Sequence, residues 1–105
     1  MNIFDIYIAY VSWGDGGKRR PVLILEKRDD SITVFNITTQ YKEKSKEIRF
    51  KYYKINEWQQ AGLDKESYID TNKTVTLPLS SVDLANPIGT LTEPDVQGFI
   101  EFLSI

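Results

Sequence analysis

Short segments in which apolar and polar residues alternate, or in which β-branched and aromatic residues gather, dominate the first half of the chain. Residues 6–12, Ile-Tyr-Ile-Ala-Tyr-Val-Ser, and the apolar run 21–26, which opens on Pro21, are typical of strands. Over residues 32–39, Ile32, Val34, Asn36 and Thr38 alternate with Thr33, Phe35, Ile37 and Thr39, as the two faces of a strand do. Apolar residues alternate with charged ones over 47–52. The pattern therefore predicts four strands over these segments.

The second half of the chain predicts shorter elements. Asn56 is a suitable N-cap for a short helix over 56–60, and Gly62 is a suitable residue to end it. Residues 68–70 and 74–77 are again rich in β-forming types and predict two further short strands.

The last segment predicts a C-terminal helix. Thr92 and Asp95 have the spacing of a capping box, and Pro94 is tolerated in the first helical turn. Apolar residues then recur at the spacing of one helix face: Val96, Phe99, Ile100 and Leu103. Helices gathered at one side of a curled antiparallel sheet predict a mostly-β fold with some α structure, a small barrel-like domain that spans residues 1–105.

Composition excludes several kinds of chemistry. The chain has 105 residues, which suits one domain with a modest core. It contains no Cys and no His, so thiol nucleophiles, thiolate or imidazole metal sites and a His general base are excluded. No segment has the roughly 20 apolar residues of a membrane span, and the N-terminus lacks the features of a signal peptide. We therefore expect a cytoplasmic protein without contact to a membrane.

The charge is distributed unevenly. The net charge is −2, which argues against a general nucleic-acid binder. Residues 18–54, however, hold 11 of the 13 Lys and Arg and 5 of the 15 acidic residues, a local balance of +6. This asymmetry predicts a basic surface on an acidic body, or else simply lysines that solvate the faces of strands.

Three groups of residues are candidates for a functional site. Residues 17–21, Gly-Lys-Arg-Arg-Pro, bring basic side chains to a predicted strand, and residues 36–40 gather hydroxyl and amide side chains at a strand end. Aromatic residues near the basic segment form the third group: Tyr10, Trp13, Tyr41, Tyr52 and Tyr53. A guanidinium, hydroxyls and aromatic rings suit a single-stranded nucleic acid. The alternative is that these are surface charges, ordinary strand residues and core aromatics.

The order of these motifs resembles the MazF/PemK family, toxins of bacterial type II toxin–antitoxin systems. The resemblance covers nearly the whole chain and rests on the terminal helix and on five segments: Asp5-Ile6-Tyr7, the glycine-rich loop 14–17, Arg20-Pro21-Val22-Leu23-Ile24, Ile37-Thr38-Thr39-Gln40 and Trp58-Gln59-Gln60-Ala61-Gly62-Leu63. Two features differ from the family pattern. Phe4-Asp5 stands where many members have Gly-Asp, and the loop 14–17 lacks their Ser-Glu-Gln run.

The resemblance implies an SH3-like barrel of the CcdB/MazF type, a homodimer and a metal-independent endoribonuclease. Such enzymes cut single-stranded RNA, often mRNA, at short sequences, use no cofactor and are held inactive by a cognate antitoxin. The key Arg of the family corresponds to Arg20 and its key Thr to Thr38. Both would act on the scissile phosphate, and the products would be a 2′,3′-cyclic phosphate and a 5′-hydroxyl.

The remaining candidates are assigned to RNA binding. Lys18 and Arg19 are expected to contact phosphates. Gln40 would read a base edge or merely cap the strand, and Trp13 would stack on a base or cover the end of the barrel. Since antitoxins of the family place an acidic segment over the RNA groove, the basic segment 18–54 is the expected antitoxin surface.

Two other functions are compatible with the same residues. The related CcdB proteins are toxins that poison DNA gyrase by binding it, and a C-terminal helix that ends on an apolar residue, here Ile105, is one of their features. The second alternative is a non-catalytic SH3-like binding module. The pair of Arg20 and Thr38 favours the ribonuclease because gyrase poisoning needs neither residue.

Overall fold

Six strands form one antiparallel sheet in the computed structural model, which describes residues 1–104. Their order across the sheet is β4-β5-β3-β2-β1-β6. The strand bounds are β1 Asp5–Trp13, β2 Gly16–Lys27, β3 Ser31–Thr38, β4 Tyr52–Lys54, β5 Tyr68–Pro78 and β6 Gly89–Thr90. The helical elements are α1 Lys46–Arg49, the 3₁₀ turn η1 Leu79–Ser81 and α2 Glu93–Leu103.

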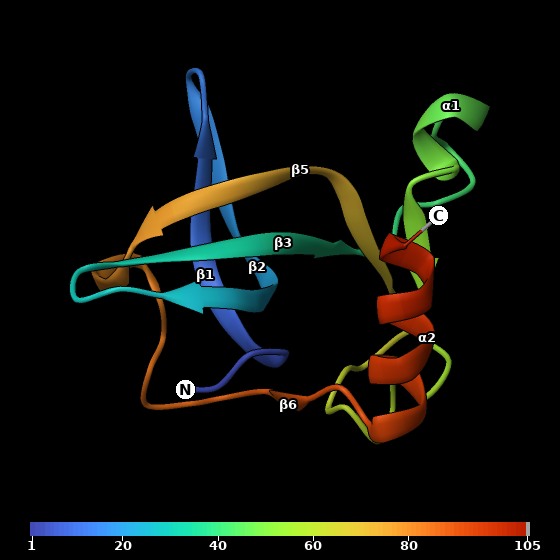
Figure 1. Cartoon of the computed structure of the whole chain (residues 1–105). Helices are drawn as coiled ribbons and strands as arrows, with labels where there is room; N and C mark the ends of the chain where they lie inside the picture. The colour runs from blue at the N-terminus through green and yellow to red at the C-terminus, as the bar shows by residue number, and fades with distance from the viewer. Residues whose placement is uncertain (105) are drawn as a thin grey trace.

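The sheet is strongly curled. The register shifts between Ile24 and Glu26 on β2, and again between Val34 and Asn36 on β3. Such irregularities bend strands and let a sheet close on itself. In Figure 1 the β1–β2 hairpin stands across β3 and β5, while α2 lies beside β4. The predicted mostly-β, barrel-like architecture with a C-terminal helix is confirmed.

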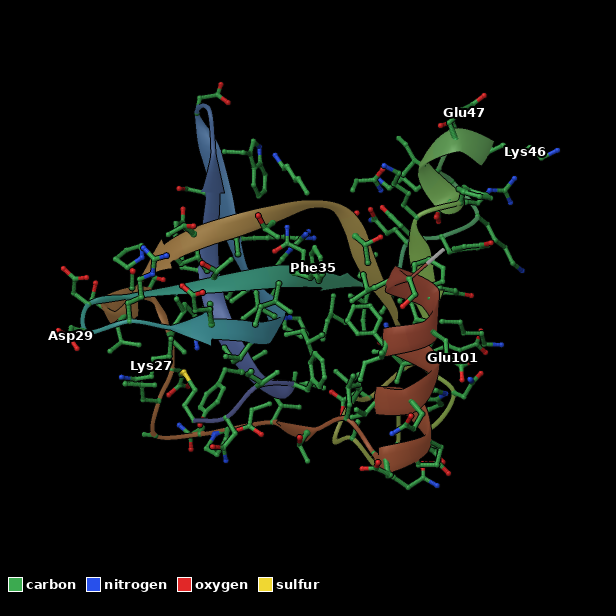
Figure 2. The ribbon with its side chains drawn as sticks, in the orientation of Figure 1. Lys27, Asp29, Phe35, Lys46, Glu47 and Glu101 are labelled. Atoms are coloured by element: carbon green, nitrogen blue, oxygen red, sulfur yellow. The ribbon has the colours of Figure 1, made fainter. Side chains whose placement is uncertain are left out.

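Apolar side chains fill both faces of the curled sheet. The cluster packed against α2 is centred on Phe99, which contacts the rings of Phe4, Phe35 and Tyr53 edge-on. The second cluster lies among β1, β2, β3 and β5 and consists of Tyr7, Ala9, Val11, Val22, Ile24, Ile32, Val34, Leu77 and Val82. Figure 2 shows Phe35 extending from β3 toward the interior.

The predicted strand over 47–52 is wrong. Residues 46–49 form the short helix α1, and only Tyr52 belongs to a strand. The Ser45 side chain accepts a hydrogen bond from the Ile48 amide, and the Arg49 amide bonds to the Ser45 carbonyl. Phe50, whose alternation suggested a buried strand face, is 77% exposed. In Figure 2 the labelled Lys46 and Glu47 of α1 point into open space.

The predicted helix over 56–60 is also wrong, because residues 56–62 form successive turns. Asn56 does not cap them. The Asp95 carboxylate of α2 instead accepts from the backbone amides of Asn56 and Glu57, at 3.0 and 2.8 Å. Asp95 therefore turns inward, and the predicted capping box with Thr92 does not form.

Other boundaries differ less. The two predicted strands 68–70 and 74–77 are parts of the single strand β5, and β2 begins at Gly16 rather than Pro21. β6 was not predicted, since two residues leave no periodic signal. No helix among residues 1–104 is long and apolar enough to cross a membrane. Ile105 lies outside the described residues.

Candidate nucleic-acid interface

The strands β2 and β3 separate at the point where the predicted site residues lie. Their pairing ends with Val22 opposite Asn36, beside Pro21, which has no amide hydrogen to donate. In an uninterrupted ladder, Arg20 would stand opposite Thr38. The two key residues thus face each other across the opening between the strands.

A pocket of about 160 Å³ occupies this opening. It is lined by Lys18, Arg19, Arg20, Pro21, Ile37, Thr38, Thr39, Gln40 and Ser67. Five of the six predicted site residues are therefore brought together by the fold, from segments that are far apart in the sequence. Ser67, the residue before β5, joins them, and no local motif predicted it.

Trp13 is the exception. It lies at the tip of the β1–β2 hairpin, its side chain is 53% exposed, and it does not line the pocket. Its indole ring contacts Gly16 across the hairpin. Trp13 also belongs to neither core cluster.

Hydrogen bonds fix some of the pocket residues. The Thr38 hydroxyl oxygen accepts from the backbone amide of Gln40 at 3.1 Å, which leaves the hydroxyl hydrogen free to donate. Arg19 is exposed and forms a 3.4 Å ion pair with Asp83. Arg20 is half-buried and forms no ion pair within residues 1–104. Of the two arginines that line the pocket, Arg20 is therefore the one that has no carboxylate partner in the described part of the chain.

The strand register places three further polar side chains on the same face of the sheet as Arg20 and Thr38. Side chains two residues apart share a face, and residues opposite each other on paired strands do as well. Asn36 stands opposite Asp70, and Asp70 stands opposite Tyr52. We call Arg20, Thr38, Asn36, Asp70 and Tyr52 the polar face.

The titration of Tyr52 reflects this arrangement. Burial raises the pKa of Tyr52, and the Asp70 carboxylate raises it further, while the positive charge of Arg20 acts in the opposite direction. The Tyr52 hydroxyl is therefore neutral at physiological pH. The sequence alone pointed to Tyr52 but not to Asp70, because the position of Asp70 depends on the register of β5 with β3 and β4.

Two further hollows adjoin the pocket and share Thr39 with it. One is mainly apolar and includes Ile8, Leu63 and Ile88. The other is lined by Tyr41 and Tyr68, whose rings stack at 4.3 Å. Together the three hollows form a groove that is polar at its centre and mainly apolar at one end, while its other end combines the two tyrosine rings with the charged residues Lys42, Glu43 and Glu66. Such a groove suits a short single-stranded segment.

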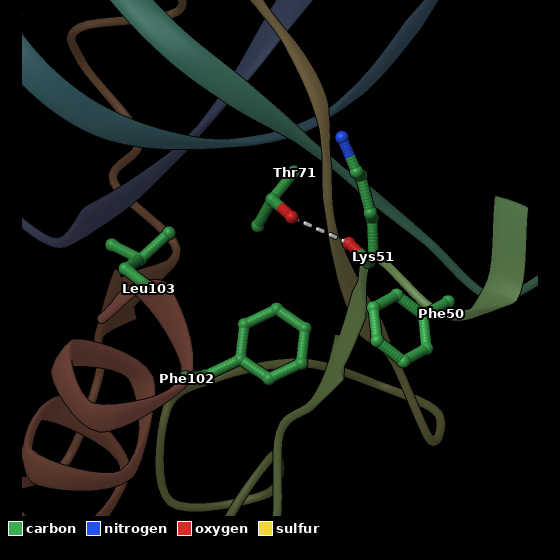
Figure 3. A pocket seen from close by; sticks show the side chains of 5 residues that line it. All are labelled: Phe50, Lys51, Thr71, Phe102 and Leu103. Carbon is green, nitrogen blue, oxygen red and sulfur yellow. Dashed lines mark hydrogen bonds between the residues drawn. The ribbon is translucent and has the colours of Figure 1, made fainter. Parts of the chain in front are cut away.

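A separate apolar surface lies between α1 and α2. Figure 3 shows Phe50 and Phe102 on opposite sides of a pocket of about 330 Å³, with Lys51, Thr71 and Leu103 completing its wall. Phe50 and Leu103 are exposed, Phe102 is partly buried, and the helices α1 and α2 carry one more exposed apolar residue each, Ile48 and Ile100. We call Ile48, Phe50, Ile100, Phe102 and Leu103 the helix surface.

The curled antiparallel sheet with a C-terminal helix is a MazF-like fold. Of 28 solved chains that match, the Mycobacterium tuberculosis toxin MazF-mt6 matches with a TM-score of 0.69 and 24% sequence identity, over 95% of this chain and 92% of that chain. Residues 3–99 match the family described as PemK-like, MazF-like toxin of type II toxin–antitoxin system. The chain belongs to this family. A comparison with curated proteins finds no match.

Proposed function

We propose that this toxin is a sequence-specific, metal-independent endoribonuclease that cuts single-stranded RNA, with mRNA in the cytoplasm as its substrate. The observation that carries the proposal is the pocket between β2 and β3, which joins Arg20, Thr38 and the basic residues Lys18 and Arg19. Family membership supports it because the key residues of the MazF/PemK pattern are both present.

The proposed reaction is a transesterification. The 2′-oxygen of one ribose attacks the adjacent phosphorus and gives its proton to water, and the bond from phosphorus to the 5′-oxygen breaks. The leaving oxygen takes up a proton, so that the products are a 2′,3′-cyclic phosphate and a 5′-hydroxyl. The Arg20 guanidinium would stabilise the additional negative charge of the transition state. Thr38 would donate its free hydroxyl hydrogen to a phosphate oxygen.

The groove offers contacts to the parts of the RNA that flank the scissile phosphate. Lys18 and Arg19 would contact neighbouring phosphates, and Gln40 would contact a base edge from the rim of the pocket. Trp13, at the tip of the hairpin, would stack on a base only where RNA extends beyond the pocket. A stacking base contributes on the order of 1–3 kcal/mol to binding.

The proposal includes two protein partners. A cognate antitoxin would bind through an acidic segment over the basic segment 18–54, which explains the local charge of +6 on an acidic chain. A second copy of the toxin would cover the helix surface, since contiguous exposed apolar patches on a soluble protein mark association sites.

The test is the cleavage of a long single-stranded RNA by the purified protein in EDTA, with the 5′ ends mapped. Discrete cuts are expected for the wild type. Arg20→Ala and Thr38→Ala should each slow cleavage by about 10²–10³-fold, as the loss of a transition-state donor does. Arg28→Ala is the matched control, because Arg28 is an exposed arginine just beyond the far end of β2 and does not line the pocket.

Intact RNA with the wild type would contradict the proposal. A gyrase supercoiling assay would then separate a protein-targeting toxin from a non-catalytic binding module. Equal cleavage by the wild type and by both pocket variants would instead place the active site elsewhere on the chain.

A further inference from the structure

Two polar atoms of the polar face have no partner, and one is a donor while the other is an acceptor. Within residues 1–104, three buried side-chain polar atoms lack a hydrogen bond: Arg20 Nε, Asn36 Oδ1 and Arg49 Nε. The first two belong to the polar face. An unpaired buried polar group weakens folding, so its presence in a native protein needs an explanation, such as a ligand that completes it.

The strand register puts these two residues on the same face, where Arg20 lines the pocket and Asn36 directly precedes Ile37, which also lines it. Asn36 stands opposite Val22, and Arg20 is two residues from Val22, so Arg20 and Asn36 are diagonal neighbours on one face. Cα atoms of diagonal neighbours are about 7–8 Å apart, a span that long side chains cover. The two side chains nevertheless do not bond to each other.

The charges around Asn36 determine which chemical group suits it. Asp70 is its direct neighbour on β5, and the Asp70 carboxylate is held in place by the Asn72 amide and side chain, at 2.9 and 2.8 Å. A negative neighbour disfavours a phosphate at Asn36 and favours a group that donates a hydrogen. Arg20, by contrast, favours a phosphate.

We infer that Arg20 and Asn36 together bind a ribose 3′-phosphate, with Arg20 donating to the phosphate and Asn36 Oδ1 accepting from the adjacent 2′-hydroxyl. This inference rests on the proposed function. In RNA the 2′-hydroxyl and the 3′-phosphate occupy neighbouring carbons of one ribose, so a donor and an acceptor are presented side by side. Deoxyribose lacks the donor.

Asn36 is then a positioning residue with two effects. It orients the 2′-oxygen toward the phosphorus that this oxygen attacks, and it distinguishes RNA from DNA by the one group that differs. Arg20 contributes equally to the binding of RNA and to the binding of DNA, because both carry the phosphate.

The experiment uses two short oligonucleotides that end at the mapped cleavage site with a 3′-terminal phosphate. All their residues are deoxyribonucleotides except the last, which is ribose in one probe and deoxyribose in the other. Neither probe can be cut, so equilibrium binding is measured directly by fluorescence anisotropy in EDTA. The ratio of the two Kd values reports the contribution of a single hydroxyl.

The wild type should bind the ribose probe about three- to tenfold more tightly, which corresponds to one net hydrogen bond. Asn36→Ala should bring the ratio near one while leaving the Kd of the deoxyribose probe unchanged. Arg20→Lys should weaken both probes by the same factor. Asn36→Asp keeps an acceptor and should keep the ratio, although its added charge weakens both probes.

Thr33→Ala is the control for damage to β3, since Thr33 lies on the same strand but on the opposite face. A ribose preference that persists in Asn36→Ala, or is absent from a wild type that cuts RNA, would overturn the inference and leave the proposed function intact. Failure of the wild type both to cut RNA and to bind either probe would overturn the proposed function itself.

Discussion

At the scale of single residues, Phe4 combines an unfavourable backbone conformation with favourable packing of its side chain. Its φ is 71°, and it is the only non-glycine residue with positive φ among residues 1–104. The MazF/PemK pattern has Gly at this position, for which this conformation costs nothing. In this chain the ring of Phe4 packs against Phe99, with the centroids 5.9 Å apart. Packing therefore offsets the cost of the backbone.

A pair of substitutions separates the two effects. Phe4→Ala removes the ring but keeps the free-energy cost of the left-handed backbone conformation. Phe4→Gly removes both the ring and this cost. We expect both variants to be less stable than the wild type, but Phe4→Gly should exceed Phe4→Ala in unfolding free energy by about 1 kcal/mol. Urea denaturation measures the difference. Greater stability of the Ala variant, the usual order in regular structure, would contradict this account.

At the residue scale, local motifs alone predicted residues that the fold brings together. Arg20 and Thr38 were recognised from short segments, and both line the pocket that opens where the pairing of β2 with β3 ends. Asp70 was missed because its closeness to Asn36 depends on the register between β3 and β5, which shifts at a bulge. No pattern in the sequence specifies that shift.

At the scale of elements, Asp95 ties α2 to β4 and to the turns 56–62. Its buried carboxylate accepts from the hydroxyl of Tyr53, at 2.8 Å, and from two backbone amides. Burial raises the pKa of Tyr53 well above its usual value, and the hydrogen bond to Asp95 and the charge of Asp95 add to this shift. The neutral hydroxyl is thus part of the folded structure.

This contact predicts a loss of stability at high pH. Tyrosines of the unfolded chain ionise near pH 10, while folded Tyr53 keeps its proton. The contribution of Tyr53 is therefore complete below about pH 10 and decreases as the pH rises above it. Tyr53→Phe should lower the unfolding free energy by about 1–2 kcal/mol at pH 8, and by less at pH 11.

Chemical denaturation at both pH values measures the effect, with Tyr10→Phe as the control at an exposed tyrosine. An equal loss for Tyr53→Phe at both pH values would show that the hydroxyl of Tyr53 does not titrate differently in the two states.

Element-scale prediction failed at α1 for a physical reason. A window of six residues with alternating apolar positions fits a strand, but only Tyr52 at its end is buried here, while Ile48 and Phe50 are both exposed. Local hydrogen bonds with Ser45 instead decide the conformation. The long strands were predicted correctly because their apolar residues do enter the core. The helix α2 was predicted correctly as well, although only Phe99 of its apolar face is fully buried, while Ile100 and Leu103 are exposed.

At the scale of the whole molecule, the helix surface exposes apolar residues that do not enter the core. A charge at Phe50, its most exposed residue, should prevent a second copy from binding. We expect the wild type to sediment as a dimer and Phe50→Glu as a folded monomer, because Phe50 is mostly exposed and contributes little to the core. Tyr10→Glu, at an exposed aromatic residue of β1, should remain dimeric. A monomeric wild type would contradict the proposal.

The central claim is that the opening between β2 and β3 cuts RNA through Arg20. The most direct measurement is mass spectrometry of the ends of an RNA of defined sequence after incubation in EDTA with the wild type or with Arg20→Ala. The account predicts 2′,3′-cyclic phosphate and 5′-hydroxyl ends with the wild type and intact RNA with the variant. Identical products from both proteins, or 5′-phosphate ends from the wild type, would contradict it.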